Sequence, residues 1–154
     1  MKLTLTKNET EAWVSLVLST EKLLEKIDSE LKKKGLPPYS WYDVLLELDK
    51  CKDGKLRFVE LGNRVLLPRY NVTRTVKRLE KAGLVKRMPS EDDARGYYAV
   101  ITRKGRTIRQ KMWPVYYNVL KGYLFNSLST KELENFLKHL RKIRKSIESD
   151  STLS

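Results

Sequence analysis

The most constraining feature of this sequence is a basic amphipathic segment near its middle. Residues 66–87, LLPRYNVTRTVKRLEKAGLVKR, contain seven Lys or Arg and one Glu, yet their apolar residues recur at helical spacing. When Val72 is set at zero on a helical wheel, Val76 and Leu79 fall within about 40° of it. Because only this narrow face is apolar, a helix formed here must bury it and present cations outward.

The outward face carries side chains that suit the major groove of DNA. Tyr70, Arg74, Lys77 and Lys81 lie opposite the apolar face, with Asn71 at the start of the helix. An α-helix fits the major groove, where Arg can pair with guanine and Asn with adenine. A solvated helix face held by intrahelical ion pairs is the weaker interpretation, because seven cations have only one anion to pair with.

A β-hairpin is expected directly after this helix. The β-prone runs 84–88 (LVKRM) and 97–102 (YYAVIT) are joined by PSEDDARG, a loop rich in turn formers. Gly83 is placed to end the helix before the first run. A basic helix followed at once by a basic hairpin predicts a winged helix-turn-helix, in which the hairpin is the wing.

The wing adds candidate DNA contacts. Lys86 and Arg87 lie on its first strand, and Arg95 beside Gly96 is placed to enter the minor groove, which attracts cations where it is narrow. The acidic residues of the loop are explained if Asp93 braces Arg95 through a bidentate salt bridge. The alternative is that these acids are solvated turn residues.

Helices are predicted on both sides of this unit. An apolar stripe at helical spacing predicts a first helix over 8–33. Ser40 is expected to cap a second helix, with Asp43 three residues on. The remaining predictions, in chain order, are a short strand at 56–58, a helix at 58–66, a long helix from Arg103 to about Phe125 with a kink at Pro114, and a last helix opened by Ser129 and Glu132. The fold class is therefore mainly α with a small β-hairpin: a winged helix-turn-helix between long N- and C-terminal helices.

The net charge is also distributed unevenly along the chain. The net charge is +13 overall, zero over residues 1–55, +10 over 56–112 and +3 over 113–154. Ordinary surface scatter would spread this excess evenly. Its concentration in the central third indicates a polyanion-binding module flanked by scaffolding.

Composition narrows the class of protein further. One cysteine excludes an intramolecular disulfide, the N-terminus lacks a signal-peptide-like apolar region, and no run approaches the length of a transmembrane helix. We therefore expect a soluble, cytoplasmic protein without membrane association. A single His, His139, and a single Cys, Cys51, cannot build a metal cluster or a catalytic triad, so no metal, cofactor or enzymatic activity is expected. A redox role for Cys51, between Lys50 and Lys52, is less favoured than packing at a helix end.

The stretch 61–105 resembles the core of MarR-type transcriptional regulators. It is similar to that family's Val-Thr-Arg recognition helix, its Leu-Glu-x-x-Gly-Leu-Val-x-Arg continuation, its Asp-x-Arg wing and its Thr-x-x-Gly start to the next helix. The matching residues are Leu61, Val72, Thr73, Arg74, Leu79, Glu80, Gly83, Leu84, Arg87, Asp93, Arg95, Thr102 and Gly105. The segment LPPYSWYDVLLEL also looks like the family's second helix, and LSTKEL like the start of its sixth.

The resemblance implies a single domain over 1–154 that forms a homodimer. Its dimerisation helices would span 8–33 and 106–148, and its winged helix-turn-helix lobe 40–105. These long helices carry apolar stripes that a small winged core cannot cover, which independently favours a partner. Two recognition helices related by a two-fold axis would read a pseudo-palindromic site.

Two groups of residues are the candidate contacts to double-stranded DNA. The recognition-helix group is Pro68, Arg69, Tyr70, Asn71, Thr73, Arg74, Lys77, Arg78 and Lys81. The wing group is Lys86, Arg87, Asp93, Arg95 and Gly96. Within the first group, we expect Arg74 and Asn71 to read bases, whereas Thr73, Arg78 and Lys81 hold phosphates.

The resemblance also implies control by a small aromatic or phenolic effector, lodged between the dimer helices and the DNA-binding lobe. The candidate lining residues are Trp13, Trp41, Tyr42, Met112 and Trp113. Packing is the default role of Trp41, which shares a helix face with Val44 and Leu48.

The function expected from all of this is a sequence-specific repressor that occludes a promoter. Two alternatives remain. A winged-helix module used only for protein contacts would be expected to show an apolar or acidic outer face. A peripheral protein that binds anionic lipid would need apolar residues free to insert, and here the core requires them.

Overall fold

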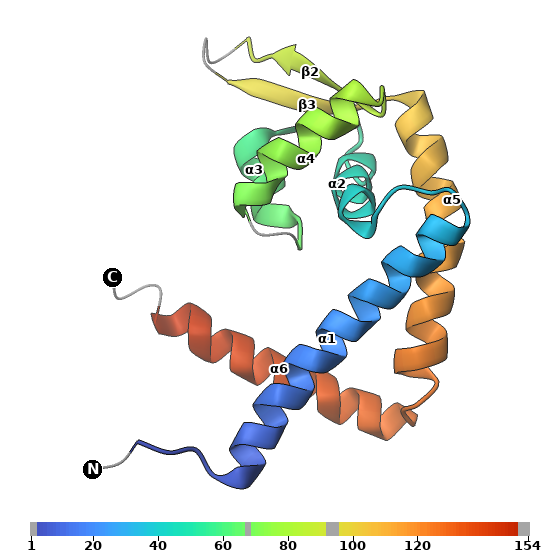
Figure 1. Cartoon of the computed structure of the whole chain (residues 1–154). Helices are drawn as coiled ribbons and strands as arrows, with labels where there is room; N and C mark the ends of the chain where they lie inside the picture. The colour runs from blue at the N-terminus through green and yellow to red at the C-terminus, as the bar shows by residue number, and fades with distance from the viewer. Residues whose placement is uncertain (1–2, 67–68, 92–95, 151–154) are drawn as a thin grey trace. The chain divides into compact units, whose positions relative to one another are not determined.

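The computed structural model describes residues 3–66, 69–91 and 96–150. These residues are mainly helical and include a small three-stranded antiparallel sheet, which confirms the predicted fold class. The chain divides into two compact units, Met1–Tyr117 and Asn118–Ser154. The larger unit holds the sheet and the helices that pack against it (Figure 1).

The elements follow the order that the sequence predicts. The larger unit contains α1 (Lys7–Lys33), α2 (Tyr39–Asp49), β1 (Lys55–Arg57), α3 (Phe58–Arg64), α4 (Arg69–Lys81), β2 (Val85–Pro89), β3 (Tyr97–Ile101) and most of α5 (Arg103–Val119). The smaller unit contains the end of α5, a π-helical segment η1 (Leu120–Phe125) and α6 (Thr130–Asp150). Thus α3 and α4 form the helix-turn-helix, and β2 and β3 form the wing. Over the described ranges, no helix combines the length and the apolarity needed to cross a membrane.

Two of the described helices, α1 and α6, begin with a reciprocal pair of hydrogen bonds between residues close in sequence. At the start of α1, the Glu9 N–H donates to Thr6 Oγ1 at 3.2 Å and the Thr6 N–H donates to Glu9 Oε2 at 2.7 Å. At the start of α6, the Glu132 N–H donates to Ser129 Oγ at 3.3 Å and the Ser129 N–H donates to Glu132 Oε2 at 2.8 Å. The second pair confirms the capping box predicted from the sequence.

The expected cap of α2 is wrong. This helix begins at Tyr39, and its cap position is Pro38, which offers no side-chain hydrogen bond. Asp28 of α1 supplies an acceptor instead, because its Oδ1 accepts the Tyr39 N–H at 2.6 Å. With that donor satisfied from another helix, α2 starts earlier and Ser40 lies inside its first turn.

The helix after the wing changes its geometry at a point that the sequence did not mark. It continues as an α-helix through Pro114 to Val119 and then becomes π-helical over Leu120–Phe125. The expected single α-helix to about Phe125 is therefore α-helical only as far as Val119. The kink expected at Pro114 stays a prediction.

The sheet and the helices α2, α3 and α4 enclose a common core. Strand β3 lies between β1 and β2 and is antiparallel to both, so that Ala99 pairs with Leu56 on one side and Arg87 on the other. The core residues are buried apolar side chains from each of these elements. They are Val44, Leu45, Leu48, Leu56, Leu61, Val65, Val72, Val76, Leu79, Leu84, Val85, Ala99 and Ile101.

A tight joint links α4, the wing and α5. Gly83 ends α4 with φ +73°, a conformation that side chains rarely adopt. Thr102 donates from Oγ1 to the Gly83 carbonyl at 2.8 Å and accepts the N–H of Gly105 at 3.0 Å. A Cβ on Gly105 would meet the carbonyl oxygen of Leu84. The start of α5 can therefore approach the end of α4 this closely only because residue 105 lacks a side chain.

We predict that Gly105→Ala destabilises the fold by about 1–3 kcal/mol, because the added methyl group must push against backbone rather than a movable side chain. The measurement is the free energy of unfolding from urea titration. Gly122→Ala is the matched control: nothing lies within 4 Å of its Cβ, so it should be neutral or stabilise by up to about 1 kcal/mol. Equal unfolding free energies for the two variants would contradict the proposed contact.

Candidate nucleic-acid interface

The orientation of α4 is set by its apolar face. Val72, Val76 and Leu79 are buried, and Thr75 is buried beside them. The rest of the described helix surface faces outward, with Arg74, Lys77, Arg78 and Lys81 exposed. The burial of one face therefore fixes a row of cations on the other. Arg69 and Tyr70 open α4, and Pro68 lies outside the described residues.

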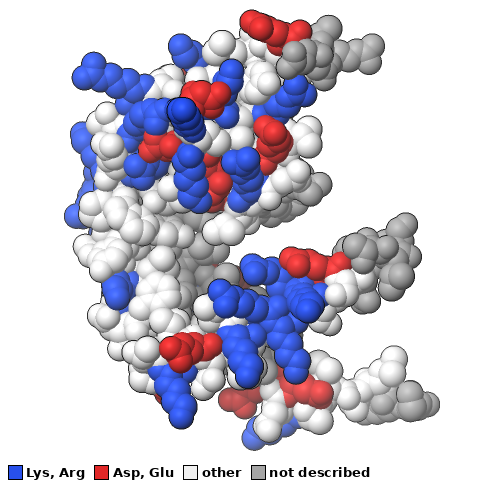
Figure 2. Space-filling view, turned by 180° about the vertical axis from the view of Figure 1, so that it is seen from behind, with Lys and Arg blue, Asp and Glu red and all other residues white. Residues whose placement is uncertain are grey.

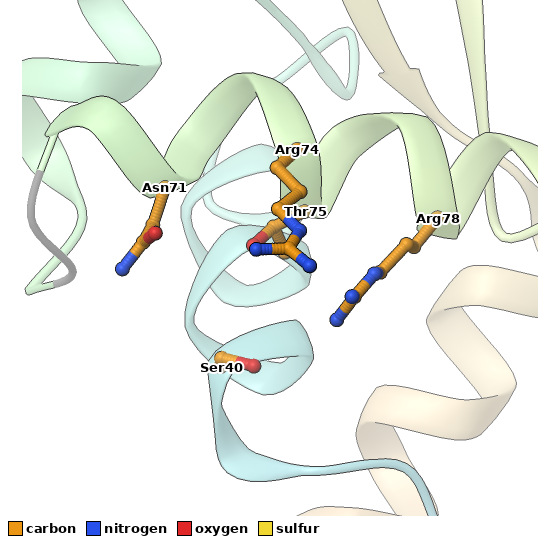
Figure 3. A pocket seen from close by; sticks show the side chains of 5 residues that line it. All are labelled: Ser40, Asn71, Arg74, Thr75 and Arg78. Atoms are coloured by element: carbon orange, nitrogen blue, oxygen red, sulfur yellow. The ribbon is translucent and has the colours of Figure 1, made fainter.

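Arg74 and Arg78 share a hollow with the first turn of α2. The hollow has a volume of about 240 Å³, and its lining residues are Ser40, Asn71, Arg74, Thr75 and Arg78. Figure 3 shows the side chains of Asn71, Arg74 and Arg78 extending from the side of α4 on which Ser40 lies. Among the described residues, neither guanidinium has a carboxylate partner within ion-pair distance. Two guanidinium groups, an amide and a hydroxyl around one hollow suit a phosphate-like anion.

Thr73 lies on the other side of α4. It lines a groove of about 290 Å³ together with Val72 and residues of α3, namely Phe58, Val59, Gly62 and Asn63. The three residues predicted to hold phosphates therefore do not form one cluster. Arg78 shares its hollow with Arg74, whereas Thr73 faces α3 and Lys81 lies at the exposed end of α4.

Two predicted wing residues occupy different environments. Lys86 is exposed on β2. The guanidinium carbon of Arg87 lies 5.2 Å from the Phe58 ring centre and 5.0 Å from that of Tyr97, and its Nη2 lies 3.8 Å from Glu80 Oε2. Arg87 thus ties the wing to α3 and α4. Its rings and its carboxylate partner leave it less available for an outside ligand than Lys86.

The far end of the wing is described only in part. Gly96 accepts the Ser90 N–H at 2.9 Å and closes the described end of the hairpin. Asp93 and Arg95 lie outside the described residues, so the bracing salt bridge and the minor-groove contact stay predictions.

The outer face of the sheet adds cations that the sequence analysis missed. The strand register places Arg57 of β1 beside Tyr98 of β3, and Lys55 two residues away on the same face. The Lys55 ammonium lies 5.1 Å and the Arg57 guanidinium 5.6 Å from the Tyr98 ring centre. Lys86 shares this face, because it pairs with Val100 on the other side of β3. The register across three strands is what gathers these charges, and periodicity within one strand could not reveal it.

An aromatic cavity of about 90 Å³ lies between α2 and α5. Its lining residues are Tyr39, Tyr42, Asp43, Leu46, Leu66, Trp113 and Tyr116. The ring of Tyr42 stacks on Tyr116 at 5.0 Å and on Trp113 at 6.2 Å between centres. Burial raises the pKa of Tyr42 and of Tyr116, and in Tyr116 the charge of Asp43 adds to this, so both phenols keep their protons at neutral pH.

Two of the five residues predicted to line an effector pocket, Tyr42 and Trp113, meet at this cavity. The other three lie elsewhere. Met112 is completely buried, Trp41 packs against the core, and Trp13 is exposed on α1.

Lys and Arg side chains dominate parts of the surface. On the face drawn in Figure 2, blue Lys and Arg side chains lie over the part of the larger unit that carries the sheet, with red Asp and Glu among them. α6 carries a further exposed group, Lys138, Arg141, Lys142, Arg144 and Lys145. Within the described ranges, no group of three His, Cys, Asp or Glu is placed to hold a metal ion.

Comparison with known proteins agrees with this architecture. Residues 34–96, which run from the turn after α1 to the residue before β3, match the sequence model of the MarR family. The match covers 63 of the 154 residues, and over this stretch the chain is similar to the MarR family. The curated relatives that the chain matches are HTH-type transcriptional regulators.

Three similar proteins illustrate the match. The HTH-type transcriptional regulator SarZ of Staphylococcus epidermidis is 28% identical over 124 residues, which is 80% of each chain. Sco3205 of Streptomyces coelicolor, a MarR family regulator solved in complex with DNA, has a TM-score of 0.86 at 24% identity, covering 95% of this chain and 91% of that one. The organohalide-sensing regulator RdhR-CbdbA1625, solved with bound 2,4-dichlorophenol, has a TM-score of 0.80 at 22% identity, covering 92% of this chain and 82% of that one.

Ser40 is the main residue of this site to which sequence reasoning assigned a different role. The sequence suggested a helix cap, whereas the structure places Ser40 in the hollow with Arg74 and Arg78. A signal could have come only from knowing that α4 crosses the start of α2. That crossing is a tertiary contact between residues more than 30 positions apart.

We predict that Arg87→Ala lowers the free energy of unfolding by about 1–2 kcal/mol, because the two aromatic rings lose their cation. Lys86→Ala, next to it on β2 but exposed, should change stability by less than about 0.5 kcal/mol. Thermal and urea unfolding of both variants measure the difference. A loss from Lys86→Ala as large as that from Arg87→Ala would contradict this division of roles.

Proposed function

We propose that this chain is a sequence-specific regulator that binds double-stranded DNA through α4 and the wing. The observation that carries the proposal is the exposed basic face of α4, held outward by burial of its apolar face. A helix with this arrangement fits the major groove and meets the negative charge of the phosphates. The DNA complex of the structural neighbour Sco3205 supports the same use of the fold.

Base reading is assigned to the N-terminal half of α4, as such helices usually contact base edges there. Asn71 and Arg74 have the groups that pair with adenine and guanine. The hollow that Arg74 shares with Arg78 and Ser40 adds a phosphate-binding position at the start of α2. Lys77, Lys81 and Thr73 complete the described part of the helix interface. Pro68, Arg69 and Tyr70 belong to the same proposal by sequence.

The wing is proposed to contact the minor groove next to the major groove that α4 enters. Lys86 is the exposed cation of its described part. Arg95 beside Gly96 would enter the groove, with Asp93 holding the guanidinium in place. Arg87 supports this arm by anchoring the wing to Phe58 and Tyr97 rather than by contacting DNA itself.

The functional unit is proposed to be a homodimer. The first half of α1 leaves large apolar side chains exposed, among them Trp13 and Leu16. α6, considered by itself, leaves Ile143 and Ile147 exposed. Exposed apolar side chains grouped on a helix mark an interaction site, and a second copy of the chain is the partner that yields two recognition helices for a pseudo-palindromic operator.

Repression is the proposed outcome of binding, through occlusion of a promoter. Release of the protein from DNA is assigned to a small aromatic or phenolic effector, which would lower the population of dimers that can bind DNA. The aromatic cavity beside Tyr42 and Trp113 supports this assignment by its stacked rings. The dichlorophenol bound to RdhR-CbdbA1625 supports the same class of compound.

Fluorescence anisotropy tests the proposal directly. The protein is titrated onto its own upstream intergenic DNA and onto a scrambled sequence, across a salt series. Tighter binding to the native sequence with a steep negative salt slope is expected. Absence of binding at low salt would overturn the proposal and favour a winged-helix module for protein contacts.

Among variants, Arg74→Ala is expected to narrow the gap in affinity between operator and scrambled DNA, because it removes a base contact worth about 1–3 kcal/mol. Lys81→Ala should weaken binding to both DNAs about equally. It should also reduce the slope of log affinity against log salt concentration by about one. The same anisotropy titrations measure both effects. If the two variants lose affinity for both DNAs to the same extent, the assignment of base reading to Arg74 is wrong.

Leu16→Asp is expected to shift the protein from dimer to monomer. Leu16 is 39% exposed and lies about 20° from Ile27 on a helical wheel, so it belongs to the apolar stripe of α1. Leu18→Asp is the matched control, because Leu18 is 46% exposed but lies about 180° from that stripe. Sedimentation equilibrium distinguishes them. Dimers that persist in Leu16→Asp would contradict the use of this stripe.

A further inference from the structure

Helix α6 carries a row of lysines along one side. When Leu140 is set at zero on a helical wheel, the apolar residues of α6 lie within about 60° of it, and four lysines lie within about 40° of the opposite point. All four are exposed, and they span about 21 Å along the helix axis. These residues, which we call the lysine stripe, are Lys131, Lys138, Lys142 and Lys145.

The charge of the lysine stripe is not balanced within α6. Residues 135–147 contain five Lys or Arg and no Asp or Glu. An ion pair on α6 joins Arg144 to Glu148 at 3.8 Å, but among the described residues no ammonium group of the stripe has a carboxylate within ion-pair distance. Helix α1 differs, because two of its lysines pair with Glu30. The lysine stripe therefore keeps its positive charge for an outside ligand.

The stability of α6 does not account for this arrangement. Lys142 lies four positions after Lys138 and three before Lys145, so neighbouring cations lie on one face and repel each other. Cations can stabilise the C-terminal end of a helix through its dipole, but this effect falls off within the last turn. The last turn of α6 carries no basic residue. The stripe thus costs stability in the free protein, as expected of a surface whose partner is an anion.

The composition of this face selects the class of anion. Within α6, no apolar side chain lies within about 60° of the centre of the stripe. Protein interfaces have an apolar centre, and an amphipathic helix on a membrane turns its apolar face toward the lipid. The apolar face of α6 lies opposite the stripe and would turn it away from a membrane. A wholly polar, cationic face suits the phosphate backbone of a nucleic acid.

The spacing of the lysines also fits such a backbone. Lys138, Lys142 and Lys145 lie about 6 and 4.5 Å apart along the helix axis, so together they span about 10 Å. Phosphates of one DNA strand advance by about 3.4 Å per nucleotide, so about three nucleotide steps cover the same length. Flexible lysine side chains can contact these phosphates without selecting a base sequence.

We propose that the lysine stripe is a second nucleic-acid contact, which binds the phosphate backbone of double-stranded DNA irrespective of sequence. It lies in the smaller unit and shares no residue with α4 or the wing. The homodimer proposed above uses the apolar face of α6, so the stripe on the opposite side of this helix stays open to DNA. The inference does not rest on base reading by α4, since DNA of any sequence is expected to bind.

Fluorescence anisotropy on a scrambled duplex tests this contact. The stripe variant combines Lys138→Gln, Lys142→Gln and Lys145→Gln, because glutamine removes the charge and has nearly the helix propensity of lysine. We expect it to bind about ten-fold more weakly at about 50 mM salt. Its slope of log affinity against log salt concentration should become shallower by about 2–3 for each stripe that engages, since each phosphate contact contributes about 0.9.

Matched variants separate the stripe from net charge. A control with three Lys→Gln changes in α1 has the same net charge as the stripe variant and should lose less than about two-fold in affinity. A variant with Lys→Arg at the three stripe positions keeps the charge and should bind as the wild type does. Equal losses in the stripe and control variants, or unchanged affinity in the stripe variant, overturn the proposal. The exposed lysines changed in the control are Lys7, Lys22 and Lys33.

Two further titrations test other occupants of the stripe. Vesicles that contain phosphatidylserine, and polyglutamate, replace the DNA. If the stripe variant loses binding to either of these but not to DNA, the DNA assignment is overturned in favour of a membrane or an acidic protein.

The outcomes also separate this inference from the proposed function. If the wild type does not prefer its upstream DNA while the stripe variant alone loses affinity, sequence-specific binding fails and the stripe contact stands. If the preference is intact and the stripe variant keeps its affinity and salt slope, the stripe contact fails. Circular dichroism and sedimentation equilibrium check that the variants are folded and dimeric. Should the triple variant fail to fold, the double variant Lys142→Gln and Lys145→Gln replaces it, with an expected change in slope of about 1–2.

Discussion

The burial of one narrow face of α4 is the constraint on which the rest of the interface depends. Val72, Val76 and Leu79 are buried in the core, and burial of such side chains contributes about 1.5–3 kcal/mol each. The helix needs this support because its cations repel one another. Arg74, Lys77, Arg78 and Lys81 make four like-charge pairs at helical spacings of three and four, each costing about 0.2–0.5 kcal/mol. Core burial exceeds that repulsion, so a basic face persists in the folded chain.

The same balance explains why the wing is built around an arginine that does not face outward. A hairpin alone is marginally stable in water, and the outer face of this sheet carries further cations. Arg87 offsets this by placing its charge between the rings of Phe58 and Tyr97, near the carboxylate of Glu80. Arg87 thus stabilises the packing of the wing although it is positively charged, whereas Lys86 beside it remains exposed to solvent.

Local patterns predicted the elements of the fold, and contacts distant in sequence account for what they missed. Helical periodicity predicted α4, turn chemistry predicted the hairpin, and the Ser129–Glu132 box was readable within four residues. The start of α2 could not be predicted from local sequence, because its cap comes from Asp28 in another helix. Of the candidate site, the basic face of α4 could be predicted from the sequence. The hollow with Ser40 could not, since it exists only where α4 crosses α2.

Three buried or partly buried aspartates show how these distant contacts are organised. Asp28 ties α1 to the first residue of α2, and Asp43 ties α2 to the residue that leads toward α4. Asp49, at the end of α2, pairs with Arg106 and Arg109 of α5. α2 is therefore held by carboxylate bonds at its start, its middle and its end, to three different parts of the larger unit. α2 also contributes Val44, Leu45 and Leu48 to the core that holds α4. Its position relative to α4 is therefore fixed both by carboxylate hydrogen bonds and by apolar packing.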